Sequence, residues 1–193
     1  MIKTIAIEEA VLHPGYTELS TRYTNGHSPI VDALCDIHGN RLDLMNKYGN
    51  EFQVLSLTSP GPQGETDPDK VSPRLHPHSL STIPHTSLGL PYLLWQAEKL
   101  AYECNNWISS ECQKNPTRFG AFCSLSMHRP AQAALELRRA VKELGLVGAI
   151  VNDWQATEEF DGNGILLYDT PDFDPFWEAV QELGVPVYFH PKV

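Results

Sequence analysis

Residues 131–153 read AQAALELRRAVKELGLVGAIVND, and this stretch indicates the fold class of the whole chain. In its first part, apolar residues recur every three or four positions, which predicts an amphipathic helix over Ala131–Leu144 that ends at Gly145. The second part, Val147–Asn152, is apolar nearly throughout, as expected of a parallel strand that is buried on both faces. A helix that leads directly into a buried strand is the repeating unit of α/β proteins.

The same two patterns alternate along the rest of the chain. Short apolar runs predict strands, and segments with helical periodicity predict the helices between them. The expected strands are Thr4–Glu8, Gln53–Thr58, Phe119–Ser124, Val147–Asn152 and Val185–His190, and the expected helices are Asn40–Tyr48, Ala97–Lys114, Ala131–Leu144 and Phe173–Leu183. This order predicts a parallel sheet, either in a TIM barrel or in an open doubly wound sheet.

The C-terminal ends of the expected strands favour the barrel. An open sheet that binds nucleotides usually has a glycine-rich turn after its first strand, whereas the first glycine of this chain is Gly15. A barrel carries functional side chains at the ends of several strands, and here three strands end at Glu8, at Asn152-Asp153 and at His190. We therefore expect an α/β fold, a partial TIM-like (β/α)8 barrel with its first five strands present.

Composition limits the possible functions. The 193 residues suffice for one domain with a substantial core. A formal net charge of −10 argues against a nucleic-acid or anionic-membrane partner. No apolar run is long enough to cross a bilayer, and the N-terminus lacks the apolar segment of a secretion signal, so we expect a cytoplasmic protein. The four cysteines have no CxxC spacing and are expected to be free, buried thiols.

Glu8 and His190 are the residues most able to carry chemistry. If both strand ends face the same barrel mouth, a carboxylate and an imidazole lie together, and divalent cations accept both ligand types. The spacing alone leaves a second interpretation open. In that interpretation Glu8 is a solvated acid at the end of a strand, and His190 is a hydrogen-bonded structural histidine.

Six motifs set these residues in a wider context. In chain order they are Ile5–Ala10, Leu57–Gly64, Phe119–Phe122, Leu125–His128, Val147–Asp153 and Val185–Pro191. Together they resemble the decarboxylase branch of the amidohydrolase superfamily, which contains 2,3-dihydroxybenzoate, γ-resorcylate, salicylate and aminocarboxymuconate semialdehyde decarboxylases. The resemblance implies a metallo-dependent hydrolase barrel, with residues 1–193 as the N-terminal portion of one barrel domain.

The resemblance also implies roles for individual residues. Glu8 and His190 match metal ligands of the family. Many members have His-x-His or Glu-x-His on the first strand, but here Ala10 stands in the second ligand position, and this Glu-x-Ala form is more similar to the fungal 2,3-dihydroxybenzoate and salicylate type than to the γ-resorcylate type. The resemblance places four residues near the substrate: Ala10, Thr58, Ser59 and Asn152.

The implied activity is a metal-dependent, non-oxidative decarboxylation of small hydroxylated aromatic acids. It would use one divalent cation, with zinc expected first and magnesium or manganese as alternatives, and no organic cofactor. The family's remaining histidine and aspartate are expected beyond Val193, so we expect the chain alone to lack activity and a stable monomeric fold. The complete enzyme would be a homodimer or homotetramer. Two alternatives stay open: a metal-dependent hydrolase of a lactone or amide on the same barrel, or an inactive truncated product of an incorrect gene model.

The segment 71–96 does not fit the resemblance. It contains four prolines, three histidines and four serines but no Asp, Glu or Lys, which suits neither a helix nor a central strand. Codons for Lys70-Val71-Ser72 can contain a splice donor site, and a codon for Gln96 can supply an acceptor site. We therefore expect a retained intron here, and a second one at Lys192-Val193; the alternative for 71–96 is a lid over the pocket.

Overall fold

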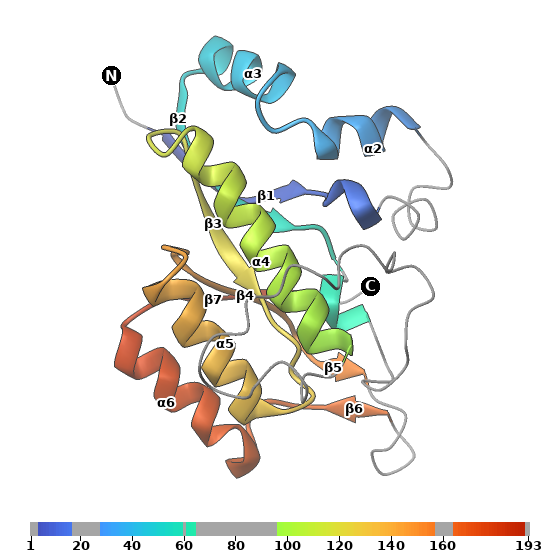
Figure 1. Ribbon diagram of the computed structural model, residues 1–193, viewed down its shortest axis with the longest axis vertical. Helices are drawn as coiled ribbons and strands as arrows, with labels where there is room; N and C mark the ends of the chain where they lie inside the picture. The colour runs from blue at the N-terminus through green and yellow to red at the C-terminus, as the bar shows by residue number, and fades with distance from the viewer. Residues whose placement is uncertain (1–3, 17–27, 60, 65–95, 157–163, 192–193) are drawn as a thin grey trace, which may run out of the picture.

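Five parallel strands form a single sheet in the order β1-β2-β3-β4-β7. The computed structural model describes residues 4–16, 28–59, 61–64, 96–156 and 164–191. The strands are β1 (Thr4–Val11), β2 (Asn50–Leu57), β3 (Phe119–Ser124), β4 (Gly148–Asn152) and β7 (Val187–His190). Each strand pairs with the next parallel strand along the chain, with helices in the connections (Figure 1), so the predicted partial barrel is confirmed.

Helices cover the outer face of this half-barrel (Figure 1). They are α2 (Ser28–Cys35), α3 (Asn40–Tyr48), α4 (Gln96–Lys114), α5 (Pro130–Lys142) and α6 (Asp174–Leu183), with short 3-10 turns η1 (Pro14–Tyr16), η2 (Gly61–Gly64) and η5 (Pro171–Phe173). The four expected helices are confirmed to within two residues at each end. None of the described helices is long and apolar enough to span a membrane.

Helix α2 and the strands β5 (Gln155–Ala156) and β6 (Ile165–Leu166) were not expected from the sequence. Helix α2 has only eight residues, and the antiparallel pair of β5 and β6 has two residues in each strand. Such short elements show no detectable hydrophobic period, because periodicity needs a window of about 11 residues to identify a helix.

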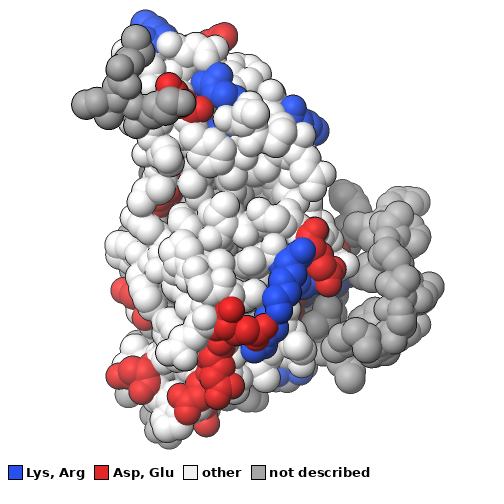
Figure 2. All heavy atoms as spheres, turned by 90° about the vertical axis from the view of Figure 1, so that its left-hand side faces the viewer, with Lys and Arg blue, Asp and Glu red and all other residues white. Residues whose placement is uncertain are grey.

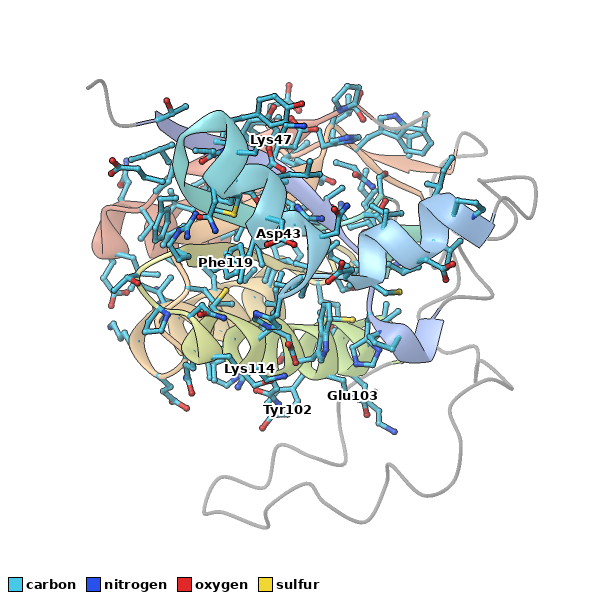
Figure 3. All side chains as sticks on the ribbon, turned by 90° about the horizontal axis from the view of Figure 1, so that it is seen from above. Asp43, Lys47, Tyr102, Glu103, Lys114 and Phe119 are labelled. Atoms are coloured by element: carbon cyan, nitrogen blue, oxygen red, sulfur yellow. The ribbon has the colours of Figure 1, made fainter. Side chains whose placement is uncertain are left out.

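The main core lies between the helices and the outer face of the sheet. It includes Leu55, Cys123, Leu137 and Phe176, all fully buried. Figure 3 shows Phe119, the first residue of β3, between α3 and α4. Ion pairs of Glu182 with Arg138 and Lys142 tie α6 to α5 on the surface. Figure 2 shows charged side chains of both signs gathered in the lower part of one face of the molecule.

The cysteines belong to this packing. All four are free thiols, and Cys104, Cys112 and Cys123 are buried. Burial raises the pKa of Cys112 to about 12, which keeps its thiol protonated and unreactive at neutral pH. The expectation of free thiols is confirmed, whereas the expectation of burial is wrong for Cys35, which is partly exposed.

A second, smaller apolar cluster lies on the inner face of the sheet. It consists of Val54, Phe122 and Ile150, with Phe52 and Tyr188 partly buried against it. Side chains alternate along a strand, so the residues two positions further along each of these strands share the inner face and lie nearer the C-terminal ends. These residues are polar: Ser56, Ser124, Asn152 and His190. The inner face thus changes from apolar to polar toward the barrel mouth.

Strand β1 differs from its prediction. It was expected to end at Glu8, but it continues to Val11, and Glu8 lies inside the strand. Its pairing with β2 is irregular between Ala6 and Glu9. Ala6 pairs with Gln53 and Glu9 with Leu55, so two residues of β1 lie opposite one residue of β2. This arrangement is a β-bulge.

The bulge resets the alternation of side chains along β1. Glu8 has a φ of 63° and is the one non-glycine residue with positive φ in the described part of the chain. Beyond the bulge, Ala10 pairs with Ser56 on the inner face, and Glu9 pairs with Leu55 on the outer face. The inner face of β1 therefore presents Glu8 and Ala10 at the barrel mouth.

We predict that a polypeptide of residues 1–193, expressed alone, self-associates. Strands β1 and β7 are unpaired edges of the described sheet, and Ile5 and Ile7 on β1 are 64% and 54% exposed. Exposed apolar edge strands pair with other chains. Analytical ultracentrifugation should detect dimers or larger species, and replacing both isoleucines by lysine should raise the monomer fraction. A wild-type monomer that unfolds cooperatively would contradict the prediction.

Candidate metal and substrate site

The six residues proposed from the sequence line one cavity of about 170 Å³ at the C-terminal ends of the strands. Glu8 and Ala10 come from β1, Thr58 and Ser59 from the loop after β2, Asn152 from the end of β4 and His190 from the end of β7. The remaining wall includes Ser56, Gln63, Ser124 and Ile150. Residues from all five strands of the sheet thus meet at the mouth of the half-barrel, where barrel enzymes place their sites.

Glu8 and His190 are in direct contact. Glu8 Oε1 lies 3.2 Å from His190 Nε2, although the two residues belong to the opposite edge strands of the sheet. The curvature of the half-barrel brings these edges together across its mouth. The predicted convergence of the two side chains is therefore confirmed.

A tyrosine that was not proposed from the sequence holds the other carboxylate oxygen. The Tyr188 hydroxyl donates a hydrogen bond to Glu8 Oε2. This bond, together with partial burial and the negative charge of Glu8, raises the pKa of Tyr188, so the phenol stays protonated as a donor. Alternation could have indicated this residue, because Tyr188 is two positions before His190 on the same strand.

The ring orientation of His190 determines which nitrogen faces Glu8. His190 Nδ1 lies 2.7 Å from the Pro191 carbonyl oxygen, and a carbonyl can only accept, so Nδ1 carries a proton. In the neutral ring, Nε2 then presents a lone pair to Glu8 Oε1. Two electron-pair donors that face each other at this distance form a suitable pair of ligands for a cation.

Asn152 is placed beside this pair by the sheet register. Asn152 and His190 are paired residues of neighbouring parallel strands, so their side chains share the inner face. Asn152 is 5% exposed, and its Nδ2 has no hydrogen-bond partner among the described residues. Ser59 Oγ lies 3.5 Å from Asn152 Oδ1, which is a long contact. The amide therefore offers an unused N–H donor at the cavity wall.

Gln63 fixes the loop that carries Thr58 and Ser59. Its side chain is 3% exposed; Oε1 accepts the backbone N–H of Asn152 at 2.6 Å, and Nε2 donates to the Tyr168 hydroxyl at 2.7 Å. This role has no signal in the sequence, because Gln63 and Asn152 are 89 positions apart and a glutamine in a loop shows no pattern.

We predict that Gln63→Leu lowers the free energy of unfolding by about 1–3 kcal/mol, because it leaves the buried Asn152 N–H and the Tyr168 hydroxyl without this partner. Gln113→Leu makes the same chemical change at an exposed position of α4 and should change stability little. Urea denaturation of both variants measures the difference. Equal stabilities would show that the loop is not held by this side chain.

The described residues do not by themselves form a cluster of metal ligands. Among them, no group of three or more His, Cys, Asp or Glu side chains is arranged to hold a cation. Glu8 and His190, the two ligands expected from the sequence, both line the cavity, and Ala10 beside them has no ligating side chain. The segment 71–95, with the expected intron, lies outside the described residues; Gln96 is the first residue of α4.

Comparison with known proteins matches the amidohydrolase family profile to residues 34–192. The chain is 34% identical over 190 residues to γ-resorcylate decarboxylase of Rhizobium sp. strain MTP-10005, which covers 97% of this chain and 50% of the relative. It also superimposes with a TM-score of 0.77 and 31% identity on a dihydroxybenzoic acid decarboxylase of Polaromonas sp. JS666, solved with manganese and the inhibitor 2-nitroresorcinol; this match covers 100% of this chain and 50% of that structure.

The overall sequence identity and the Glu-x-Ala motif on the first strand point to different types of decarboxylase. The Glu-x-Ala form suggested a greater similarity to the fungal 2,3-dihydroxybenzoate type, but 2,3-dihydroxybenzoate decarboxylase of Aspergillus niger is only 24% identical over 219 residues, a match that covers 94% of this chain and 71% of the relative. The γ-resorcylate relative is 34% identical. The chain spans about half the length of the γ-resorcylate decarboxylases that it matches.

Proposed function

Because the chain belongs to the amidohydrolase family, we propose that this protein is a metal-dependent enzyme that removes carbon dioxide from small hydroxylated aromatic acids. The observation that carries the proposal is the contact between Glu8 and His190 in a cavity whose wall also presents the free amide donor of Asn152. The names of the similar decarboxylases support the same reaction class. In this reaction a proton replaces the carboxylate on the ring, so neither an oxidant nor a reductant is needed.

The donor set of the cavity fits one divalent cation. We assign Glu8 and His190 as its ligands, since a carboxylate and a neutral imidazole together suit zinc, manganese or magnesium. The manganese in the similar Polaromonas structure supports a divalent ion of this kind. When bound, the cation would supply positive charge to the carboxylate and ortho-hydroxyl oxygens of the acid.

The residues around the pair hold its two members in place. Tyr188 binds the second oxygen of Glu8, which leaves Oε1 directed at His190. The Pro191 carbonyl fixes the His190 tautomer that exposes the Nε2 lone pair. Partners that orient ligands in this way typically change metal affinity by about 10- to 100-fold when they are removed.

The substrate would be bound beside the metal ligands. We assign Asn152 Nδ2 as a donor to a carboxylate or phenolic oxygen of the acid, because a buried donor without a partner gains most from an oxygen acceptor. Thr58 and Ser59 border the same space, and the small side chain of Ala10 leaves room next to Glu8. We assign no described residue to protonation of the ring.

The test is an assay of the protein expressed from the complete gene that contains this chain. Incubation with 2,6-dihydroxybenzoate, 2,3-dihydroxybenzoate and salicylate, each with manganese or zinc, should release carbon dioxide and the matching phenol. Chromatography of the phenols identifies the preferred acid, and sedimentation tests the expected homodimer or homotetramer. Hydrolysis of lactones or amides without decarboxylation would reject the proposal.

A further inference from the structure

We propose that Arg41 of α3 is a positioning residue, which holds Glu8 in its inward orientation from the opposite side of the sheet. The guanidinium binds the backbone and side chains that surround the bulge of β1, but it does not line the cavity. The consequence for metal affinity rests on the proposed role of Glu8 as a ligand. The restraint of the bulge by Arg41, called the Arg41 clamp below, rests on the contacts of Arg41 alone.

The bulge needs such support because its conformation is unfavourable. Glu8 has a φ of 63°, in the left-handed region that residues with a Cβ seldom occupy. Conformations of this kind persist where the surrounding structure fixes them, and they concentrate at functional sites. In an unconstrained strand, Glu8 would return to extended geometry and the bulge would be lost. Each residue of β1 on one side of the bulge would then point to the opposite face of the sheet.

Arg41 contacts the bulge on both strands. Its Nη2 donates to the Ala10 carbonyl oxygen at 2.7 Å, and its Nη1 lies 3.3 Å from both Glu9 Oε2 and Gln53 Oε1. Glu9 and Ala10 directly follow Glu8, and Gln53 pairs with Ala6 just before the bulge. The three acceptors therefore fix β1 directly after Glu8 and β2 opposite the start of the bulge, and a planar guanidinium can reach all of them at once.

Helix α3 delivers Arg41 to this position. The helix begins at Asn40, and Asp36 accepts the backbone N–H groups of Gly39 and Asn40, each at 2.7 Å. Arg41 therefore lies in the first turn, at the end of the helix that Asp36 anchors. Its side chain is 13% exposed, so its contacts are largely shielded from water.

A matched arginine provides the control. Arg118 donates to the carbonyl oxygens of Glu51 and Asn50 and to Asn46 Oδ1, at 2.8–3.1 Å. It joins α3 and β2 as Arg41 does, but at the N-terminal end of β2, away from the cavity. Arg41→Met and Arg118→Met therefore remove the same kind of side chain and a similar set of hydrogen bonds.

The experiment combines two measurements on the protein expressed from the complete gene. Hydrogen exchange of the metal-free protein, followed by mass spectrometry, should show faster exchange in the peptide covering β1 for Arg41→Met than for Arg118→Met. Titration with Mn²⁺, followed by electron paramagnetic resonance, should show at least tenfold weaker binding for Arg41→Met and less than a twofold change for Arg118→Met. Arg41→Lys keeps the positive charge but loses the several N–H donors of the planar guanidinium. Its β1 exchange rate and its Mn²⁺ affinity should both fall between those of wild type and Arg41→Met.

The outcomes test the Arg41 clamp and the proposed metal site separately. Unchanged exchange in β1 and wild-type Mn²⁺ affinity in Arg41→Met would overturn the clamp. If the wild-type protein binds no Mn²⁺, the proposed metal site fails, whereas the exchange of β1 still decides whether Arg41 holds the bulge. If Arg41→Met does not fold, the same comparison is made between Arg41→Lys and Arg118→Lys, and equal β1 exchange in those two would overturn the clamp.

Discussion

Replacing Glu8 by glutamine is expected to weaken Mn²⁺ binding by more than a hundredfold and to abolish decarboxylation. Among the described residues, Glu8 is the one carboxylate that lines the cavity. Glutamine has nearly the same shape, and its Oε1 still accepts the hydrogen bond from Tyr188. The substitution therefore removes the charge facing His190 while it leaves the geometry of the bulge in place. Losing a ligand should exceed the 10- to 100-fold effect that is typical of residues around a metal's ligands.

Isothermal titration with Mn²⁺ and the decarboxylation assay measure this effect. Glu143→Gln makes the same change at an exposed position after α5 and should leave both measurements unaltered. Thermal unfolding without metal should be similar in wild type and Glu8→Gln. If Glu8→Gln binds Mn²⁺ with wild-type affinity, Glu8 is not a metal ligand. The function proposed from the contact between Glu8 and His190 would then be rejected.

Asn152→Leu is expected to reduce kcat/KM by about 10- to 100-fold without lowering stability. A hydrogen bond to a charged group contributes about 1.5–3 kcal/mol, which corresponds to that loss when the donor to an anionic substrate is removed. The side-chain Nδ2 has no partner to lose among the described residues. The backbone N–H of Asn152 still donates to Gln63 in the variant, so the loop after β2 stays attached.

Kinetics and urea denaturation together distinguish this role from a structural one. A structural asparagine would lose stability and activity in parallel, as we expect for Gln63→Leu. Ser59→Ala, which removes only the long contact to Asn152 Oδ1, should have a small effect on both. Full activity of Asn152→Leu would exclude this amide as a substrate donor.

The sequence predicted the fold closely because the repeated pattern is local. Each buried strand is an apolar run, and each covering helix has a stripe of apolar residues, so helices such as α3 and α4 were found within two residues of their ends. The order of strands in the sheet followed as well, since a parallel strand joined to the next through a helix usually lies beside it. The two-residue strands β5 and β6 and the eight-residue helix α2 carry too little pattern to be recognised.

The site was partly accessible from the sequence for the same reason. Asn152 and His190 end their strands as predicted, and the C-terminal ends of parallel strands meet at one end of a barrel. Glu8 was proposed as a metal ligand at the end of its strand; it lines the cavity, but the strand boundary was wrong by three residues.

By itself, the sequence determined the βα order, the buried faces of the strands and the set of polar residues at their C-terminal ends, because each of these depends on neighbours within a few positions. Only the tertiary structure decided how Glu8 turns inward, that Tyr188 binds it from the far edge of the sheet, and that Gln63 ties a loop to Asn152. These features depend on sheet curvature, on a bulge and on contacts between residues up to 180 positions apart. A local pattern has no physical means of encoding such contacts, because they form only when the packed strands bring both partners together.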